Sequence, residues 1–282
     1  MPEILVTGAD GQLGRSLRKR AGGNWHFAGR LQLDATDAEA VRRYMAEREI
    51  DLVVNCAAYT DVDRAEEEEA AADRVNRLAA RNLAEAAAQY GATLIHISTD
   101  YVFPGTGCRP CREEDPTAPT GAYGRTKLAG ERAVVASGCR YLILRTSWLY
   151  SEYGRNFVKT IRRSAAERDT LRVVADQIGS PTYAGDLAAT IRFLAESGRY
   201  AGHEGIYHYA NEGSCSWYDF ACEIVRRSGL TCDVRPCRTD EYPHKAQRPA
   251  YSVLDTTKIA RTFGLAIPRW RDSLAACLEK LG

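Results

Sequence analysis

A glycine-rich loop between a short apolar run and a helix-like segment constrains this chain more than any other feature of its sequence. The run Ile4–Thr7 leads into Gly8, and glycines recur at Gly11 and Gly14 within a pattern that predicts a helix over 11–21. Glycine permits a tight turn and lets backbone N–H groups approach an anion closely, and the helix N-terminus adds unpaired N–H groups. Three glycines alone are a weak signal. A strand before them and a helix after them are what a dinucleotide-binding βαβ unit requires.

The first 150 residues alternate short apolar runs with helical patterns. We predict further strands at 25–28, 51–55, 93–97 and 141–144, and helices at 37–49, 66–90 and 122–135. Such alternation indicates a parallel sheet with helices on both faces. The predicted fold class is therefore α/β: a Rossmann-type doubly wound parallel sheet with a smaller C-terminal α/β substrate lobe.

After Arg145 the regular alternation of apolar runs and helical patterns ends. The later patterns predict helices at 156–168, 186–196, 217–228 and 270–281, and a short strand at 206–209. We assign residues 1–147, joined by residues 182–205, to an NAD(P)-binding domain, and residues 148–282 mainly to a substrate-binding lobe. Open α/β sheets bind ligands at the carboxyl ends of their strands, so we expect the second lobe to roof that crevice.

Composition excludes several classes of protein. The 38 Lys and Arg residues nearly balance 37 Asp and Glu residues, which argues against binding a nucleic-acid polymer through a broad basic field. No run of about 18 apolar residues predicts a membrane span. The N-terminal residues lack the pattern of a signal peptide, and the nine cysteines are an odd number without an export signal. We therefore expect reduced thiols and a cytoplasmic location.

The cysteines and histidines do not predict a metal site. Cys108 and Cys111 have the spacing of half a zinc site, and Cys232 with Cys237 could supply the rest, but structural zinc sites usually pair two tighter motifs. His96 lies in an apolar run and is expected in the core. The other histidines considered lack metal-ligand spacing and are expected on the surface or in loops: His203, His208 and His244.

The end of the second predicted strand bears on the choice of cofactor. NAD-binding domains usually carry an acidic residue there to hold the ribose 2′-hydroxyl, whereas this chain has Arg30. An arginine could pair with a 2′-phosphate, which favours NADPH, with NADH as an alternative donor. Asp37 is better placed than Asp34 to cap the following helix, so we assign Asp34 to the adenine amine.

Tyr123 and Lys127 are four residues apart in a predicted helix and so lie on one face. A phenol titrates near pH 10, and an adjacent ammonium is expected to lower the phenol pKa so that it can exchange a proton with a carbonyl or alcohol. Thr99 follows the fourth predicted strand, where a parallel sheet holds its site, and could hydrogen-bond the same oxygen.

These motifs resemble the extended short-chain dehydrogenases/reductases, and most closely the dTDP-4-dehydrorhamnose reductase family. The resemblance extends over nearly the whole chain in the family's order. It rests on TGADGQLG from Thr7, NCAAYTDVDRAE from Asn55, STDYVFPG from Ser98, YGRTKLAGE from Tyr123, RTSWLY from Arg145, DQIGSPT from Asp176, and Arg248-Pro249.

The resemblance implies a role for each matching position. Catalysis would fall to Tyr123 as proton donor, Lys127 as its partner and Thr99 at the sugar carbonyl. Asp100 and Trp148 would contact the substrate. Cofactor contacts would come from Gly8, Gly11, Gln12, Leu13, Arg30, Asp34, Ala35, Ala57, Ala58, Tyr59, Thr60, Tyr123 and Lys127. The implied reaction is reduction of the 4-keto group of dTDP-4-dehydro-6-deoxy-L-mannose (dTDP-4-dehydrorhamnose) to dTDP-L-rhamnose, a step in polysaccharide biosynthesis, with NAD(P)H.

Two departures sharpen this implication. Sugar-nucleotide dehydratases of the superfamily carry an acidic pair after the threonine, but here Asp100 is followed by Tyr101, which favours reduction over dehydration. Some family members bind magnesium at a dimer contact through glutamates, where this chain has Arg15 and, by alignment, Gly185. We therefore expect no metal, and a monomer or weak homodimer.

Several alternatives stay open. Trp148 could simply be a core residue, and Arg248 could pair with the substrate diphosphate or form an ordinary surface ion pair. The chain could also reduce or epimerise another sugar nucleotide. A relative of the family serves as a non-catalytic NADP-binding regulatory subunit of methionine adenosyltransferase, but such a protein need not keep the tyrosine acid.

Overall fold

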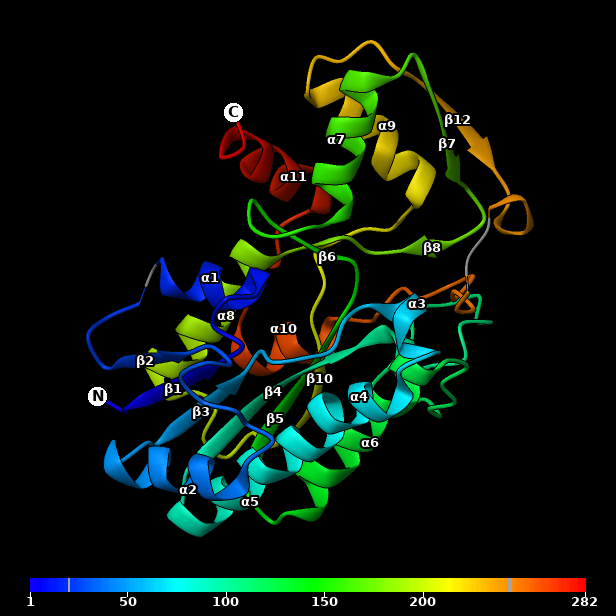
Figure 1. Ribbon diagram of the computed structural model, residues 1–282. Helices are drawn as coiled ribbons and strands as arrows, with labels where there is room; N and C mark the ends of the chain where they lie inside the picture. Colours follow the sequence, from blue (N-terminus) through cyan, green and yellow to red (C-terminus); the bar gives the residue numbers. More distant parts are fainter. Residues whose placement is uncertain (20, 243–244) are drawn as a thin grey trace.

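The computed structural model describes residues 1–19, 21–242 and 245–282, and its centre is a six-stranded parallel sheet (Figure 1). The strand order is β10-β5-β4-β3-β1-β2. These strands are β1 (Ile4–Thr7), β2 (Trp25–Ala28), β3 (Leu52–Asn55), β4 (Thr93–Thr99), β5 (Arg140–Thr146) and β10 (Gly205–His208). The chain winds outward in opposite directions from β1, so the crevice between the ends of β1 and β3 is the switch point at which such sheets bind ligands.

Helices cover both faces of this sheet, because its central strands are apolar on both sides. One face is covered by α1 (Gln12–Arg18), α8 (Ala184–Ser197) and α10 (Thr257–Phe263), whose apolar side chains share a core with the strands. The other is covered by α2 (Ala38–Glu47), α5 (Ala79–Tyr90) and α6 (Ala122–Ala136). This arrangement confirms the predicted α/β fold class.

The helical segment predicted over 66–90 is interrupted in the structure. It comprises α4 (Glu69–Asp73), a π-helical turn η1 (Arg74–Leu78) and α5, and the short helix α3 (Val62–Ala65) precedes it. Asn76 in the π-helical turn is buried, and its side chain bonds to the backbone N–H of Tyr59. The π-helical turn therefore points the Asn76 side chain inward, toward the loop that contains Tyr59. The sequence pattern of a regular helix could not indicate this.

A second lobe stands above the sheet in Figure 1 and has its own apolar core. Its helices are α7 (Phe157–Glu167), α9 (Trp217–Arg227) and α11 (Trp270–Glu279). Three strand pairs support them: β7 (Thr170–Val174) with β12 (Asp233–Cys237), β6 (Leu149–Tyr150) with β9 (Thr182–Tyr183), and β8 (Ile178–Gly179) with β11 (Cys215–Ser216). Two 3-10 turns, η2 (Asp100–Val102) and η3 (Thr239–Glu241), complete the elements. The division at residues 147/148 stays a prediction.

His208 corrects one expectation. It was expected on the surface or in a loop, but it lies fully buried in β10, where its Nδ1 is 3.1 Å from the carbonyl oxygen of Cys111. Burial lowers its pKa to about 3, so the imidazole is neutral at neutral pH. His96 is buried as expected, and its Nδ1 is 3.0 Å from the Asn55 amide. His203 is exposed, and His244 lies outside the described residues.

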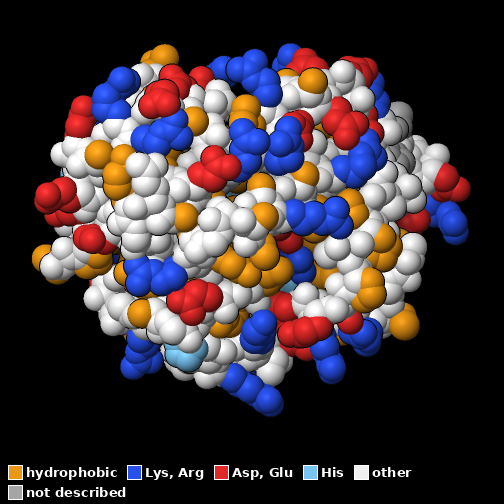
Figure 2. All heavy atoms as spheres, turned by 90° about the horizontal axis from the view of Figure 1, so that it is seen from below, with side chains coloured by type: hydrophobic (Ala, Val, Ile, Leu, Met, Phe, Trp, Pro, Cys, Tyr) orange, Lys and Arg blue, Asp and Glu red, His pale blue; other side chains and the backbone are white. Residues whose placement is uncertain are grey.

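The surface carries both signs of charge. Figure 2 shows Lys and Arg interspersed with Asp and Glu over the face seen from below. Within the described part of the chain, no helix is both long and apolar enough to cross a bilayer.

Candidate active site

The glycine loop forms one end of a groove of about 620 Å³ along the carboxyl edge of the sheet. Gly8 has a φ of +63°, and a Cβ there would lie 2.5 Å from the backbone nitrogen of Ala57. A Cβ on Gly14 would lie equally close to the Gly8 carbonyl oxygen. Only glycine fits either position, because the backbone segments touch. The loop therefore presents bare backbone at the start of α1, as a pyrophosphate site requires.

The structure directs the next two side chains away from this groove. The Gln12 Oε1 atom accepts hydrogen bonds from Ser151 Oγ at 2.9 Å and Asn156 Nδ2 at 3.0 Å, both in the second lobe. Leu13 is buried in the core beneath α1. These two residues can therefore contribute backbone N–H groups to a ligand in the groove, while their side chains join the lobes and fill the core.

Two arginines lie at the far end of the groove, around Asp34. Arg30 follows β2, and Arg74 comes from the π-helical turn; both side chains line the groove. One oxygen of Asp34 accepts bonds from the Thr36 N–H and hydroxyl, at 2.9 and 2.7 Å, and these bonds lower the carboxyl pKa. The charges of the two arginines lower it further. This end of the groove thus combines an ionised carboxylate with two exposed cations. Arg74 was missed because nothing local marks it.

The segment after β3 forms the floor of the groove. Ala57, Ala58 and Tyr59 line the groove together with Ala35, whereas Thr60 is exposed and is not part of its lining. Asn55 and Asn76 hold the segment, accepting the N–H groups of Ala57 and Tyr59 at 3.1 and 2.9 Å. Asn76 also donates to the Thr126 hydroxyl in α6 at 3.0 Å. The groove is therefore attached directly to the helix that carries Tyr123.

Tyr123, Lys127 and Thr99 come together where α6 meets the end of β4. The Lys127 Nζ donates to the Ile97 carbonyl at 2.6 Å, and burial lowers the lysine pKa to about 8 while the Glu131 carboxylate opposes the shift. Tyr123 is hydrogen-bonded to Thr99, but burial outweighs that bond and raises the phenol pKa above its ordinary value. The expected lowering of the phenol pKa by Lys127 is therefore wrong. Desolvation keeps the phenol protonated.

Two aromatic neighbours place Tyr123 between the groove and the second lobe. Tyr59 from the groove packs on the same small apolar cluster as Tyr123. On the other side, the rings of Tyr101 and Tyr123 meet edge to face with centroids 5.4 Å apart. The phenol thus lies between the groove that Tyr59 lines and the cavity that Tyr101 lines.

Asp100 is a buried carboxyl beside the phenol. The Thr99 hydroxyl donates to its Oδ1 at 3.0 Å. Burial raises the carboxyl pKa to about 6, although hydrogen bonds from Ser252 and Thr99 oppose the shift. This acid therefore changes protonation just below neutral pH.

Trp148 has an unusual backbone conformation, with a φ of +47°. Its ring stacks on that of Trp217, with centroids 3.4 Å apart and planes 8° from parallel. Gly179 contacts the indole so closely that a Cβ there would lie 2.5 Å from it. A non-glycine residue in the left-handed region requires support from its surroundings, and Trp217 and Gly179 supply it.

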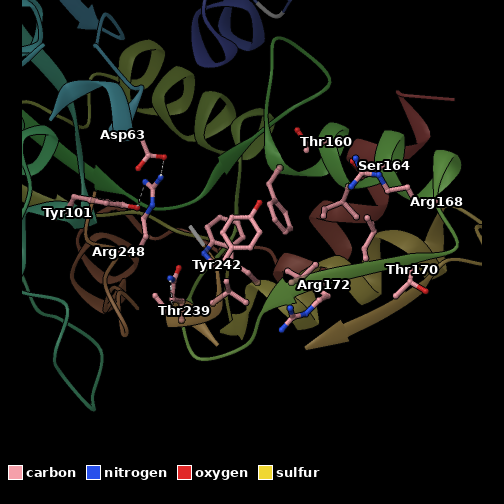
Figure 3. Close-up of a pocket in the computed structure, with 17 residues that line it drawn as sticks. Asp63, Tyr101, Thr160, Ser164, Arg168, Thr170, Arg172, Thr239, Tyr242 and Arg248 are labelled. Carbon is pink, nitrogen blue, oxygen red and sulfur yellow. Dashed lines mark hydrogen bonds and ion pairs between the residues drawn. The ribbon is translucent and has the colours of Figure 1, made fainter. Parts of the chain in front are cut away.

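A second cavity of about 740 Å³, lined by Trp217 of this aromatic pair, opens between the second lobe and residues Asp63 and Tyr101 of the first (Figure 3). Its apolar wall comes from Phe157, Ile161, Leu171, Val173 and Trp217, and its charged groups include Arg168, Arg172, Arg248 and Asp63. The Arg248 guanidinium forms an ion pair with Asp63, with Nη2 2.6 Å from Oδ2, and its Nη1 lies 3.4 Å from the Tyr101 hydroxyl. Arg248 therefore combines an ion pair with a position facing the cavity.

A buried ion pair holds together the elements that carry Tyr123 and Thr99. Glu131, one turn beyond Lys127, pairs with Arg145 at 2.7 Å, and both side chains are 3% exposed. The Ser98 hydroxyl donates to the same carboxylate. The pair joins α6 to β4 and β5, so the two elements that carry Tyr123 and Thr99 keep a fixed relation.

The described residues contain no cluster of three or more His, Cys, Asp or Glu side chains arranged to hold a metal ion. Arg15 instead stacks on the Tyr153 ring at 4.9 Å. All nine cysteines are free thiols.

Comparison with known proteins identifies relatives along the full chain. Residues 2–282 match the model of the family described as RmlD substrate binding domain. A dTDP-4-dehydrorhamnose reductase of Aggregatibacter actinomycetemcomitans is 42% identical, covering 97% of each chain. A Streptomyces antibioticus protein named "Probable dTDP-4,6-dihydroxy-2-methyloxan-3-one 4-ketoreductase" is 46% identical over 96% of this chain and 92% of its own.

A solved structure extends this similarity to three dimensions. The dTDP-4-dehydrorhamnose reductase of Bacillus anthracis, determined in complex with NADP, is 39% identical and superposes with a TM-score of 0.94. The match covers 99% of this chain and all of the other. These findings confirm the family resemblance that the sequence motifs indicated.

Proposed function

This chain belongs to the RmlD substrate binding domain family, and on that premise we propose that it reduces dTDP-4-dehydrorhamnose to dTDP-L-rhamnose with NADPH. The observation that carries the proposal is the position of Tyr123, a protonated phenol hydrogen-bonded to Thr99 between the groove and the second cavity. A carbonyl reductase needs an acid at that junction, because the alkoxide formed from the keto group must be protonated.

The groove fits a phosphorylated dinucleotide. Gly8 and Gly11, with the N–H groups of Gln12 and Leu13, would hold the pyrophosphate, and Asp34 with Ala35 would hold the adenine. Arg30 and Arg74 would bind a ribose 2′-phosphate, whose charge favours NADPH over NADH. Ala57, Ala58 and Tyr59 would run toward the nicotinamide, with Thr60 just outside the groove lining. When bound, NADPH supplies the hydride for the keto carbon.

The chain's own residues handle the proton. Tyr123 donates it to the sugar oxygen, and Thr99 hydrogen-bonds that oxygen and orients it. Lys127 would contact the ribose, with its ammonium held by the Ile97 carbonyl and charged below its pKa of about 8. The raised phenol pKa keeps Tyr123 protonated until a stronger base, the alkoxide, forms.

The second cavity would take the nucleotide half of the substrate, with Asp100 and Trp148 at the sugar. An apolar wall and nearby arginines suit a base and a diphosphate. The carboxyl of Asp100 is followed by Tyr101 rather than a second acid, so the site lacks the pair that elimination of water would use. This absence favours net reduction.

A second candidate is the reduction of a related dTDP-keto sugar, because the Streptomyces antibioticus relative bears such a name at 46% identity. A regulatory role without turnover is disfavoured by the presence of Thr99, Tyr123 and Lys127 together. The expected partner is the small-molecule substrate. A monomer or weak homodimer in the cytoplasm remains our prediction.

The decisive experiment measures the oxidation of NADPH, by its loss of absorbance, in the presence of dTDP-4-dehydrorhamnose generated by an epimerase. We expect turnover by the wild type, and weaker turnover when UDP replaces dTDP in the substrate. Failure to oxidise NADPH with this substrate, while another dTDP-keto sugar is reduced, would support the second candidate. No turnover with any nucleotide sugar, despite NADPH binding, would support the regulatory role.

A further inference from the structure

One carboxylate joins helix α3 to the loop 245–248, whose Arg248 lines the second cavity. Asp63 lies in α3, three residues beyond Thr60. Its Oδ1 accepts the backbone N–H groups of Ala246 at 2.9 Å and Lys245 at 3.3 Å. Its Oδ2 accepts Nη2 of Arg248 at 2.6 Å. The side chain therefore binds the loop 245–248 twice, through its backbone and through its arginine.

This arrangement fixes the direction of the Arg248 guanidinium. Asp63 holds one end of the guanidinium, and the Tyr101 hydroxyl lies 3.4 Å from Nη1. Figure 3 shows Arg248 between Asp63 and Tyr101, with both interactions marked. The Arg248 side chain is 24% exposed, and all three residues line the cavity. A guanidinium has five N–H donors in a planar fork, so these two contacts leave donors for a ligand.

An arginine already fixed by a carboxylate loses less side-chain freedom when it binds an anion. We propose that Asp63 is a positioning residue that holds Arg248 toward the diphosphate of the nucleotide-sugar substrate, an inference that rests on the proposed function. In this proposal Asp63 acts through Arg248 and not at the reacting atoms. Its effect falls on substrate affinity rather than on the chemical step.

The direct test is binding of dTDP and of thymidine, measured by calorimetry on wild type and Asp63→Asn. Asparagine keeps the shape and can still accept an N–H of loop 245–248, but it removes the charge that holds the guanidinium. We expect dTDP to bind about tenfold more weakly, the loss of one charge-assisted contact, while thymidine affinity changes less than about twofold. An equal loss for both ligands, or unchanged or tighter dTDP binding, would overturn the proposal.

A matched control separates positioning from simple support of the loop. Glu67→Gln removes the neighbouring ion pair between Glu67 and Lys245, in the same loop, without touching Arg248. We expect this variant to bind dTDP like the wild type. An equal loss in Glu67→Gln and Asp63→Asn would mean that Asp63 only anchors the loop, which contradicts the proposal.

Kinetics and a double-mutant cycle complete the test. Asp63→Asn should raise the KM for the dTDP-sugar about tenfold and leave kcat and the KM for NADPH within about twofold. In an Arg248→Ala background the same change should have no further effect on that KM, because it acts through the arginine. Additive effects would refute the inference. If the wild type itself binds dTDP but does not turn over the sugar, the proposed function fails while the binding test of Asp63 still stands.

Discussion

The cofactor groove and the cavity of the second lobe are built in different ways. The groove takes its walls from loops that directly follow β1, β2 and β3 and from the helical stretch up to Ala79. The cavity draws on residues from Asp63 to Arg248, spread over both lobes. Short motifs can therefore specify the groove, whereas the cavity exists only once the second lobe has folded. We expect substitutions in one region to leave ligand binding in the other nearly unchanged.

The largest effect should come from Tyr123, which lies between the two regions. Tyr123→Phe removes the proton donor, and kcat should fall by about 10²–10⁴, the usual contribution of a positioned acid. Affinities for NADPH and dTDP, measured by calorimetry, should stay within about twofold. Tyr90→Phe, at an exposed phenol far from the site, is the matched control. A comparable loss of kcat in both variants would contradict the role of Tyr123.

Asp100 should make a stability contribution that depends on pH. Its pKa is raised from 3.8 to about 6, so the folded state binds the proton more tightly and stability from this group falls as pH rises from about 4 to about 6. Asp100→Asn removes that cost and should raise the free energy of unfolding at pH 7.5 by up to about 3 kcal/mol. Urea unfolding of the wild type and the variant at pH 7.5 and pH 4 measures this difference in the free energy of unfolding. The gain should nearly vanish at pH 4, and a gain independent of pH would contradict this account.

Arg30 tests the far end of the groove. Arg30→Ala should raise the KM for NADPH about tenfold, since one charge-assisted contact to the 2′-phosphate is lost, while the KM for NADH changes little. Arg74→Ala should act in the same direction. Equal changes for both cofactors would mean that Arg30 does not contact the phosphate. A change in dTDP affinity would break the independence of the two regions.

Trp217 tests the opposite region and should give the smallest effect. Trp217→Leu removes the ring stacked on Trp148, and an aromatic pair contributes about 0.5–1.5 kcal/mol. The KM for the dTDP-sugar should rise about two- to tenfold, with the KM for NADPH unchanged. An unchanged sugar KM would indicate that Trp148 needs no support from Trp217.

The sequence predicted the sheet well because its strands are continuous apolar runs. The predicted strand at 25–28 coincides with β2, and that at 51–55 begins one residue before β3. The parallel pair β7–β12 and helix α10 were missed. The segment Asp233–Cys237 contains an aspartate, an arginine and a proline, so it has no apolar run that would predict a strand. It forms a strand by pairing with Thr170–Val174. Tertiary context determines such elements.

The same distinction holds for the site residues. Tyr123, Lys127 and Thr99 could be predicted because they lie in one helix and at one strand end. Arg74 and Asp63 were not predicted. Nothing near Arg74 in the sequence marks a site, and Asp63, although it lies in the motif that begins at Asn55, has its partners about 180 residues further along the chain. The phenol pKa was also mispredicted. Helical spacing gives the position of an ammonium, but the burial that dominates the shift appears only in the folded protein.

The most direct test of the account follows the hydride itself. The wild type would convert dTDP-4-dehydrorhamnose with NADPH that carries deuterium at the transferred position, and the product would be examined by NMR. We expect dTDP-L-rhamnose with deuterium at C4 in a single configuration. Consumption of NADPH with deuterium at another carbon, or a sugar product without deuterium, would contradict it.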